Sequence, residues 1–302
     1  MIYTVTFQPS IDLFYRLPGS LTPGCIHRAR AQWLHPGGKG LNVAIVLTRL
    51  GVPARALCFV AGQTGQLYRA LAAGCCDAEL IELSESETRI NAKIEADTET
   101  ALNAPGAVPD ENALRQLEDR ITSLTPDDCL VLSGKTDAAL LTRFGSLCKN
   151  VGAKLVADTS GEALSACLPL HPYLIKPNAE ELAALLHVPV PDKKSAPALL
   201  KRAQAMGAEN ILLSMGADGA MLLCADGRLL SANAPVFGSI VSTVGAGDSM
   251  LAGFLAAQQK GADASEALAF SVAAGSASVC GQWLAEKEAV FELRNRISVC
   301  DL

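Results

Sequence analysis

Residues 129–158 have the sequence CLVLSGKTDAALLTRFGSLCKNVGAKLVAD, in which two short apolar runs flank a longer helical pattern. The apolar runs are Cys129–Ser133 and Lys154–Asp158, and the helical pattern covers residues 137–150. Short continuous apolar runs are typical of parallel strands that are covered on both faces. The stretch therefore predicts a strand–helix–strand unit within an α/β sheet.

The same alternation continues in both directions along the chain. We expect further strands at Ile2–Phe7, Ala56–Val60, Tyr173–Lys176, Ile211–Ser214 and Ala220–Cys224. We expect further helices at 41–50, 110–122, 178–187, 195–206, 247–260, 263–280 and 286–297. This pattern predicts an α/β fold with a doubly wound, mostly parallel sheet flanked by helices.

Two segments, near 12–34 and 88–102, interrupt the alternation. They contain short alternating runs, such as Ile90–Ile94, without intervening helices. We expect them to form a small antiparallel flap on the main sheet, so that residues 1–302 make one domain with a β-sheet lid. Because the edge strands of such a flap are open to pairing, we also expect a homodimer that forms through the lid.

The composition is that of a globular chain, with 50% apolar and 19% charged residues. None of the ten cysteines forms a Cys-x-x-Cys pair and no His-x-x-x-His pair occurs, which argues against a structural zinc site. The N-terminus does not resemble a signal peptide, and the longest uncharged stretch, Ala267–Ala285, is too polar for a membrane span. We therefore expect a cytoplasmic protein with buried, reduced cysteines and no membrane partner.

Charge is unevenly distributed along the chain, whose formal net charge is −6. Residues 1–76 contain seven basic residues and a single acid, Asp12, whereas residues 77–302 contain 30 acidic and 18 basic residues. A front region with a net charge of +6 suits an anionic ligand. The basic region lacks interleaved aromatic residues and the whole chain is acidic, so we expect no nucleic-acid partner.

The first of three glycine-bearing clusters, PGGKGLN at Pro36–Asn42, leads into the helix expected at 41–50. Glycines let the backbone approach a ligand closely, and a helix N-terminus presents free N–H groups to an anion. Lys39 adds a positive charge, and Asn42 offers both a donor and an acceptor to a hydroxyl group. A simple turn that begins a helix is the alternative interpretation. The spacing of a Walker A loop is absent.

The second cluster, TVGAGDS at Thr243–Ser249, opens the helix expected at 247–260. The N–H groups of Gly245, Ala246 and Gly247 could form a nest for developing negative charge. Asp248 is either a carboxylate that favours the first turn of a helix or a base that takes a proton from a hydroxyl attacking phosphorus. Both interpretations remain open at this stage.

The third cluster, KPNAEE at Lys176–Glu181, follows a predicted strand and begins a helix. Asn178 and Glu181 have the spacing of a capping box, which accounts for them structurally. Being one helical turn apart, they could instead hold a hydrated Mg²⁺ near phosphate groups.

In this order and separation, the three clusters resemble those of the pfkB (ribokinase-like) family of carbohydrate kinases over nearly the whole chain. The resemblance is strongest to the branch of 1-phosphofructokinases and tagatose-6-phosphate kinases. Further matching segments are Gln8–Asp12, Thr88–Asn91 with Lys93, and Ser214–Gly219. The resemblance implies a ribokinase-like fold, with ATP and Mg²⁺ as cofactors.

The resemblance also implies roles for individual residues. Asp248 would be the general base, and the backbone amides of 245–248, which include those of Gly245, Ala246 and Gly247, would form an anion hole. The substrate site would contain Asp12, Gly38, Lys39, Asn42 and Asn91. Arg89 would approach the substrate's phosphate from the lid, with Arg28 as a further candidate for that phosphate. The nucleotide would contact Lys176, Asn178, Ser214, Gly216 and Gly219, and Glu181 would bind the metal through water.

One segment departs from the family pattern. The family usually has Ser-Gly-Ser-Leu-Pro where this chain has Ser133-Gly-Lys-Thr-Asp137, so Lys135 replaces a serine near the substrate phosphate. Lys135 could contact that phosphate, fill the pocket or point away. Gln8 replaces the usual asparagine of the opening motif.

The resemblance implies ATP-dependent phosphorylation of a ketohexose phosphate. Fructose 1-phosphate, which would give fructose 1,6-bisphosphate, comes first, and tagatose 6-phosphate and fructose 6-phosphate are the alternatives. We expect the basic front region to attract this dianion. A protein of a different functional class also stays open, namely a non-catalytic regulator that binds a sugar phosphate. The altered segment 133–137 motivates it, and the intact Gly245, Gly247 and Asp248 argue against it.

Overall fold

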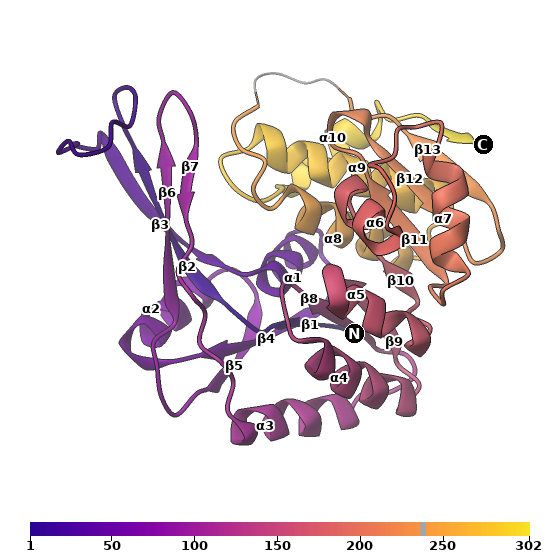
Figure 1. The fold of residues 1–302 in the computed structure, drawn as a ribbon, viewed down its shortest axis with the longest axis horizontal. Helices are drawn as coiled ribbons and strands as arrows, with labels where there is room; N and C mark the ends of the chain where they lie inside the picture. The colour runs from indigo at the N-terminus through magenta and orange to yellow at the C-terminus, as the bar shows by residue number, and fades with distance from the viewer. Residues whose placement is uncertain (236–239) are drawn as a thin grey trace.

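The strand–helix–strand unit of residues 129–158 lies inside a large sheet in the computed structural model, which describes residues 1–235 and 240–302 (Figure 1). Within those residues the sheet has ten strands in the order β14-β13-β12-β11-β10-β9-β8-β1-β4-β5. Its strands are β1 (Ile2–Thr6), β4 (Ala54–Val60), β5 (Asp77–Glu82), β8 (Cys129–Ser133), β9 (Lys154–Asp158), β10 (Leu174–Ile175), β11 (Asn210–Ser214), β12 (Ala220–Leu223), β13 (Leu229–Ala232) and β14 (Val299–Asp301).

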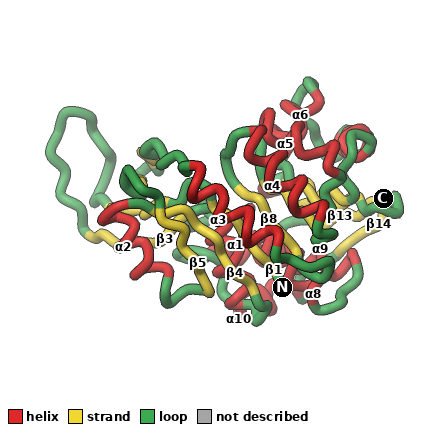
Figure 2. Tube along the Cα trace, turned by 90° about the horizontal axis from the view of Figure 1, so that it is seen from below, coloured by secondary structure: helices red, strands yellow, loops and turns green. Residues whose placement is uncertain are grey.

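Helices cover both faces of this sheet, as the alternation of strands and helices predicts. They are α1 (Lys39–Arg49), α2 (Gly62–Ala72), α3 (Glu111–Thr122), α4 (Ala138–Asn150), α5 (Gly161–Cys167), α6 (Ala179–Leu186), α7 (Ala196–Gln204), α8 (Ala246–Gln259), α9 (Ala264–Cys280) and α10 (Lys287–Arg294). Val131 of β8 belongs to the same buried cluster as residues of α1, α8, α9 and α10, whereas its neighbours Leu130 and Leu132 belong to the cluster that contains residues of α3 to α7. Figure 2 shows α4 and α5 on one side of β8 and α8 and α10 on the other. The predicted doubly wound α/β fold is confirmed.

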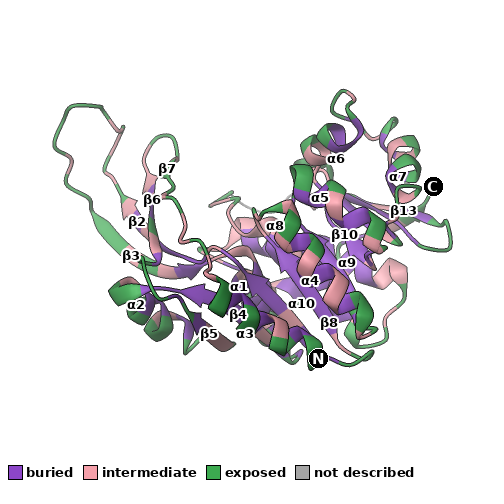
Figure 3. Cartoon of the chain, turned by 60° about the horizontal axis from the view of Figure 1, so that its bottom comes forward, coloured by how far each residue is buried: buried purple, intermediate pink, exposed green. Residues whose placement is uncertain are grey.

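The parallel part of the sheet, from β11 to β5, brings the carboxyl ends of its strands to one edge. Thr6 at the end of β1 lies beside Ser133 of β8, and Ser133 lies beside Asp158 of β9. Every residue of β8 is buried, as Figure 3 also shows by its purple colour. Loops that follow these strands therefore meet at a single edge, where α/β sheets place their ligands.

The prediction that Ala220–Cys224 is a parallel strand is wrong. Strand β12 runs antiparallel to β11, with Ser214 opposite Ala220. The five residues between these two strands form a tight turn around a short 3-10 helix, Gly216–Asp218, and a parallel connection would need a crossover of a dozen residues or more. The sequence interpretation also missed α2, α5, β5, β13 and β14.

A separate small sheet contains both segments that lack helices. Its strands are β2 (Ser10–Arg16), β3 (Ala31–Gly37), β6 (Arg89–Glu95) and β7 (Thr100–Leu102), in the order β3-β2-β6-β7. It projects from the large sheet at the left of Figure 1. The predicted location is correct, but the predicted antiparallel arrangement is wrong for the central pair, because β2 and β6 are parallel. Each follows a parallel strand of the large sheet, β1 or β5, so both leave the same edge in the same direction.

The basic side chains of residues 1–76 mostly have acidic partners, so this region does not act as a lobe of net charge +6. Ion pairs join Arg16 to Glu95, Lys39 to Asp158, Arg49 to Glu286, Arg55 to Asp77 and Arg69 to Glu82. Each partner comes from beyond residue 76. The expectation that these seven charges together attract an anion is therefore wrong, and any attraction must come from individual side chains at the site.

Cys58, Cys129, Cys148, Cys167 and Cys224 are free thiols and are buried. Burial raises the pKa of the Cys58 thiol to about 11, so this thiol stays protonated and unreactive. The uncharged stretch from Ala267 onward forms most of α9, which packs against α8 in the core. Among the described residues, no helix is both long enough and apolar enough to cross a membrane.

Candidate active site

One cavity lies where the carboxyl edge of the large sheet faces the small sheet, and a second adjoins it between the turn after β11 and helices α8 and α9. The polar cavity has a volume of about 570 Å³ and is lined by Ser10, Gly38, Lys39, Asn42, Arg89, Asn91, Lys93, Asn103, Lys176, Asn178, Glu181, Ser214, Val244, Gly245, Gly247 and Asp248. The second, the apolar cavity, has a volume of about 680 Å³. Asn178, Ser214 and Gly247 line both, so the two cavities meet at the N-termini of α6 and α8.

The glycines of the first cluster let α1 begin directly against the end of β1. A Cβ atom on Gly38, whose φ is +128°, would lie 2.4 Å from Thr6 Cγ2, and a Cβ on Gly37 would lie 2.6 Å from Asp12 Oδ2. The Thr6 hydroxyl accepts a hydrogen bond of 2.9 Å from the Leu41 amide, in the first turn of α1. A simple turn that begins a helix would not require the backbone of Gly37 and Gly38 to lie so close to Asp12 and Thr6. The close packing at this edge of the cavity therefore explains these glycines better.

Asp12 lies just behind the wall of the polar cavity. Its Oδ1 accepts hydrogen bonds of 2.9 Å from Ser10 Oγ and from Asn91 Nδ2. The Asn91 side chain is fixed in turn, because its Oδ1 accepts a hydrogen bond from the Ala104 amide. Ser10 and Asn91 line the cavity themselves, so Asp12 fixes two polar side chains of the cavity wall.

Two basic side chains of β6 face the polar cavity from the small sheet. Arg89 donates hydrogen bonds to the carbonyl oxygens of Gln8 (2.9 Å) and Ala104 (3.3 Å), and Lys93 donates one of 3.0 Å to Asn103 Oδ1. Burial lowers the pKa of Arg89, which nearby Asp12 partly offsets. Arginine keeps its charge in proteins, so the cavity has a cationic wall that suits a phosphate group.

The N-terminus of α8 forms the opposite wall. Gly245 is its N-cap, with φ +78°, and the first hydrogen bond of this turn runs from the Ser249 amide to the Gly245 carbonyl at 2.8 Å. The amides of Gly247 and Asp248 therefore have no intrahelical partner. A Cβ on Gly247 would lie 3.3 Å from Lys176 Nζ, so the missing side chain leaves room for the ammonium group beside these amides. The arrangement suits a bound anion.

Asp248 is only 6% exposed and lines the polar cavity. Asn42 Nδ2 donates a hydrogen bond of 2.7 Å to its Oδ2. Burial raises the pKa of Asp248 to about 6, with a further contribution from the negative charge of Asp158, while Lys39, the Asn42 hydrogen bond and Lys176 oppose the rise. A carboxylate with such a pKa is ionised at neutral pH and is basic enough to take a proton from a hydroxyl.

Asp158 is a residue that the sequence interpretation did not select. It ends β9, is 1% exposed, and its Oδ1 lies 3.1 Å from Lys176 Nζ and 3.5 Å from Lys39 Nζ. Burial alone would raise the pKa of this carboxyl, but the two ammonium groups lower it overall. Its position as the last residue of a predicted parallel strand was the signal that could have identified it.

Asn178 and Glu181 form the capping box that their spacing predicts. Asn178 Oδ1 accepts a hydrogen bond of 2.7 Å from the Glu181 amide, and Glu181 Oε2 accepts one of 2.9 Å from the Asn178 amide. Both also line the polar cavity, so a capping role does not remove Glu181 from the site. Within the described part of the chain, no three His, Cys, Asp or Glu side chains cluster as metal ligands would.

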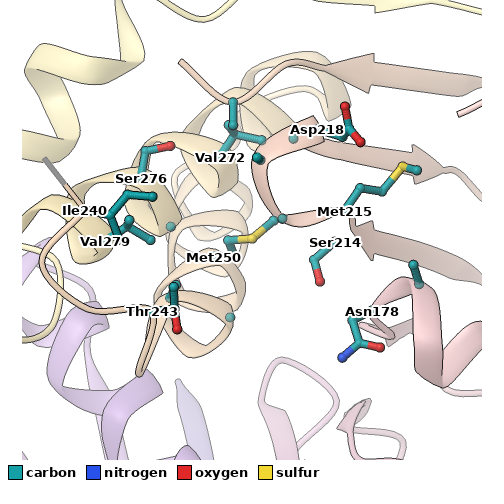
Figure 4. Close-up of a pocket in the computed structure, with 18 of the residues that line it drawn as sticks. Asn178, Ser214, Met215, Asp218, Ile240, Thr243, Met250, Val272, Ser276 and Val279 are labelled. Atoms are coloured by element: carbon teal, nitrogen blue, oxygen red, sulfur yellow. The ribbon is translucent and has the colours of Figure 1, made fainter. Parts of the chain in front are cut away.

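The apolar cavity contains the predicted nucleotide-side residues Ser214, Gly216 and Gly219. Gly219 has φ +90°, and a Cβ there would lie 2.1 Å from the Ala232 carbonyl oxygen, so this turn requires glycine. Figure 4 shows Ser214 and Met215 across the cavity from Val279, with Met250 between them. Such a mixture of apolar side chains and a few polar groups is typical of small-ligand sites.

Two predicted substrate residues lie elsewhere. Lys135 is exposed two residues beyond the end of β8, and Arg28 is exposed in the segment between β2 and β3. Neither lines either cavity. The structure also brings Lys93, Ser10 and Asn103 to the polar cavity. Lys93 and Ser10 belong to segments that match the family pattern, whereas the sequence interpretation gave no signal for Asn103.

Comparisons with known proteins agree with this geometry. The family model "pfkB family carbohydrate kinase" matches residues 7–285. The chain is 34% identical to a 1-phosphofructokinase of Bacillus subtilis (strain 168), over 100% of both chains. It is 32% identical to a D-tagatose-1-phosphate kinase of Bacillus licheniformis, again over 100% of both.

A solved structure, phosphofructokinase-2 from Escherichia coli in complex with substrates and products, superposes with a TM-score of 0.91. It shares 29% sequence identity and 98% coverage of both chains. The large, mostly parallel sheet with a separate small sheet is therefore the ribokinase-like fold. Because the family model covers most of the chain and these relatives match its full length, the protein belongs to the pfkB family of carbohydrate kinases.

Proposed function

We propose that this carbohydrate kinase transfers the γ-phosphoryl group of ATP to a hydroxyl of a ketohexose phosphate. Fructose 1-phosphate is the preferred substrate and fructose 1,6-bisphosphate the product. The observation that carries the proposal is a buried carboxylate, Asp248, in a cavity whose other wall holds Arg89 and Lys93. A base and a phosphate-binding wall in one cavity suit an acceptor that already carries a phosphate.

In this proposal the acceptor hydroxyl gives its proton to Asp248 while its oxygen attacks the γ-phosphorus. The new P–O bond forms as the bond to the leaving ADP oxygen breaks. Asn42 holds Asp248 Oδ2, so the other carboxylate oxygen is directed to the proton. The free amides of Gly247 and Asp248, with the ammonium group of Lys176, stabilise the negative charge of the group in transfer.

The sugar binds between the small sheet and α1. Asp12, through Ser10 and Asn91, orients the groups that contact the hydroxyls, Gly38 and Lys39 line the site, and Arg89 and Lys93 bind the existing phosphate. Support for a 1-phosphate comes from the relatives, whose names specify 1-phosphofructokinase and D-tagatose-1-phosphate kinase. Fructose 6-phosphate and tagatose 6-phosphate are the competing acceptors.

The nucleotide binds in the apolar cavity, with its phosphates directed to the N-terminus of α8. Its volume of about 680 Å³ falls in the range of small-molecule sites. The carboxylate of Glu181 at the cavity boundary fits a Mg²⁺ that keeps most of its waters. When bound with ATP, Mg²⁺ would neutralise part of the phosphate charge. The chain's own residues, Lys176 and Asn178, position the phosphates from the other side.

A non-catalytic regulator is the second function that the sequence left open. The reason for considering it was the altered segment 133–137. However, Lys135 of that segment is exposed and lies outside both cavities. A protein that only binds sugar phosphates has no need of a base such as Asp248. The geometry therefore favours the enzyme.

We expect Asp248→Asn to lower kcat by about 10²–10⁴-fold, the usual effect of losing a general base. The measurement is ATP turnover with fructose 1-phosphate, fructose 6-phosphate and tagatose 6-phosphate, and fructose 1-phosphate should give the highest kcat/KM. Asp119→Asn, an exposed carboxylate on α3, is the matched control and should change nothing. An Asp248→Asn enzyme with most of its activity would disprove the assigned base.

The same base predicts the pH dependence of the wild-type enzyme. Because the pKa of Asp248 is raised to about 6, the carboxylate becomes protonated below that pH, and kcat/KM should fall about tenfold per pH unit there. In Asn42→Leu the hydrogen bond that lowers this pKa is lost, so the acidic limb should move to higher pH. A profile of Asn42→Leu that overlays the wild type would contradict this role of Asn42.

The two arginine candidates for the sugar phosphate can be separated directly. Arg89→Gln should raise KM for fructose 1-phosphate by at least about tenfold, because a charge-assisted hydrogen bond contributes about 1.5–3 kcal/mol. The KM for ATP should stay within about twofold of the wild type. Arg28→Gln removes an exposed arginine and should leave both KM values unchanged. If instead Arg28→Gln raised the KM for fructose 1-phosphate and Arg89→Gln did not, the phosphate site would lie at the loop between β2 and β3.

We also propose a homodimer that forms through the small sheet. Its support is the exposed apolar side chains of Leu34 on β3, Ile90 on β6 and Leu102 on β7, next to strand edges that can pair. Sedimentation velocity at micromolar concentration should show a dimer, and Ile90→Glu should shift it toward the monomer. A wild-type chain that sediments as a monomer would refute this part of the proposal.

A further inference from the structure

One buried carboxylate holds two ammonium groups at the polar cavity. Asp158 Oδ1 is 3.1 Å from Lys176 Nζ and 3.5 Å from Lys39 Nζ. The three residues come from β9, from the segment after β10, and from the first turn of α1. A single oxygen atom thus connects two elements that carry different parts of the site.

The carboxylate keeps this arrangement at a cost. Its second oxygen, Oδ2, is buried and has no hydrogen-bond partner among the described residues, and a buried unpaired acceptor is destabilising. Asp158 does not itself line either cavity, whereas both lysines line the polar one. The chain therefore uses the carboxylate to fix its neighbours, and not for contact with a ligand.

Without Asp158, both lysines would have other carboxylates within reach. Lysine has a long flexible stem, and the charges of Asp248 and Glu181 already act on Lys39. An ammonium group that moved onto Asp248 would neutralise the base and block the proton transfer. Asp158 prevents this by competing for both ammonium groups.

We propose that Asp158 is a positioning residue, which holds Lys39 and Lys176 beside the N-terminus of α8 so that they attract the transferring phosphoryl group and leave Asp248 free. The inference rests on the proposed function, in which Asp248 is the base. It extends that function to a residue that touches neither sugar nor nucleotide.

Asp158 also acts on Asp248 through its charge. The groups that influence Asp248 are Asp158, which raises its pKa, and Lys39, Lys176 and the Asn42 hydrogen bond, which lower it. The substitution Asp158→Asn removes the negative charge near Asp248 and leaves both ammonium groups in place. The pKa of Asp248 should then fall, and the acidic limb of the kcat/KM profile should move to lower pH. A residue that only supported the fold would not shift this limb.

The experiment compares Asp158→Asn and Asp158→Glu with Asp128→Asn. Asp128 is a matched control, because it is a largely buried carboxylate, 13% exposed, that pairs with the N-terminal amine at 2.9 Å at the opposite end of β8. We expect Asp158→Asn to lower kcat/KM about 100-fold, which is the effect of displacing a catalytic group by about 1 Å. The acidic limb of its kcat/KM profile should lie at lower pH than in the wild type. Asp158→Glu keeps the charge and should lower kcat without moving the limb. Asp128→Asn should change neither.

A double-mutant cycle with Lys176→Gln provides the second measurement. If Asp158 acts through Lys176, the two losses in kcat/KM should be far from additive, whereas independent sites add to within about twofold. Additive losses, or an unmoved acidic limb in Asp158→Asn, would overturn the proposal. If Asp158→Asn does not fold, the cycle of Asp158→Glu with Lys176→Gln takes its place, and additive losses in kcat/KM there would overturn the proposal.

Failure of the proposed function would look different from failure of this inference. If Asp248 is not the base, the acidic limb should persist in Asp248→Asn, whatever happens at position 158. Non-additivity between Asp158 and Lys176 would still report their coupling. An acidic limb that depends on Asp248, together with additive losses at 158 and 176, would instead support the base and reject the positioning role.

Discussion

The parallel pairing of β1, β8 and β9 constrains the rest of the site, because it aligns Thr6, Ser133 and Asp158 in one row at the carboxyl edge of the sheet. Two of these strand ends then have different functions. Thr6 anchors the first turn of α1, and Asp158 holds the two lysines. A shift of one residue in this register would turn these side chains to the other face of the sheet.

Two helices that are far apart in the sequence meet in front of this row. Gly40 lets α1 pass close to β1, since a Cβ there would lie 2.5 Å from the Val5 carbonyl oxygen. That approach brings Asn42 within 2.7 Å of Asp248 at the start of α8. Asp248, the proposed base, is thus oriented by a residue 206 positions earlier in the chain, and its environment belongs to the fold as a whole.

Much of this arrangement could be predicted from the sequence because it depends on local patterns. Apolar runs located β1, β8 and β9, and the glycine clusters located the helix N-termini that carry Asn42 and Asp248. Asp158 and the antiparallel direction of β12 could not be predicted with the same means. A carboxylate at a strand end becomes part of a site only when the fold brings to it one lysine from α1 and another from the segment after β10. The direction of β12 depends on a five-residue turn.

The pairing of charges along β5 has a further consequence for how copies of the chain associate. Strand β5 lies at one edge of the large sheet, and its acidic residues Asp77, Glu79 and Glu82 form ion pairs with Arg55, Arg120 and Arg69. An incoming strand would have to desolvate this row of charges, which protects the edge from sheet extension and aggregation. The exposed apolar side chains of the small sheet carry no such protection, so the proposed homodimer would form through the sheet that also forms one wall of the cavity.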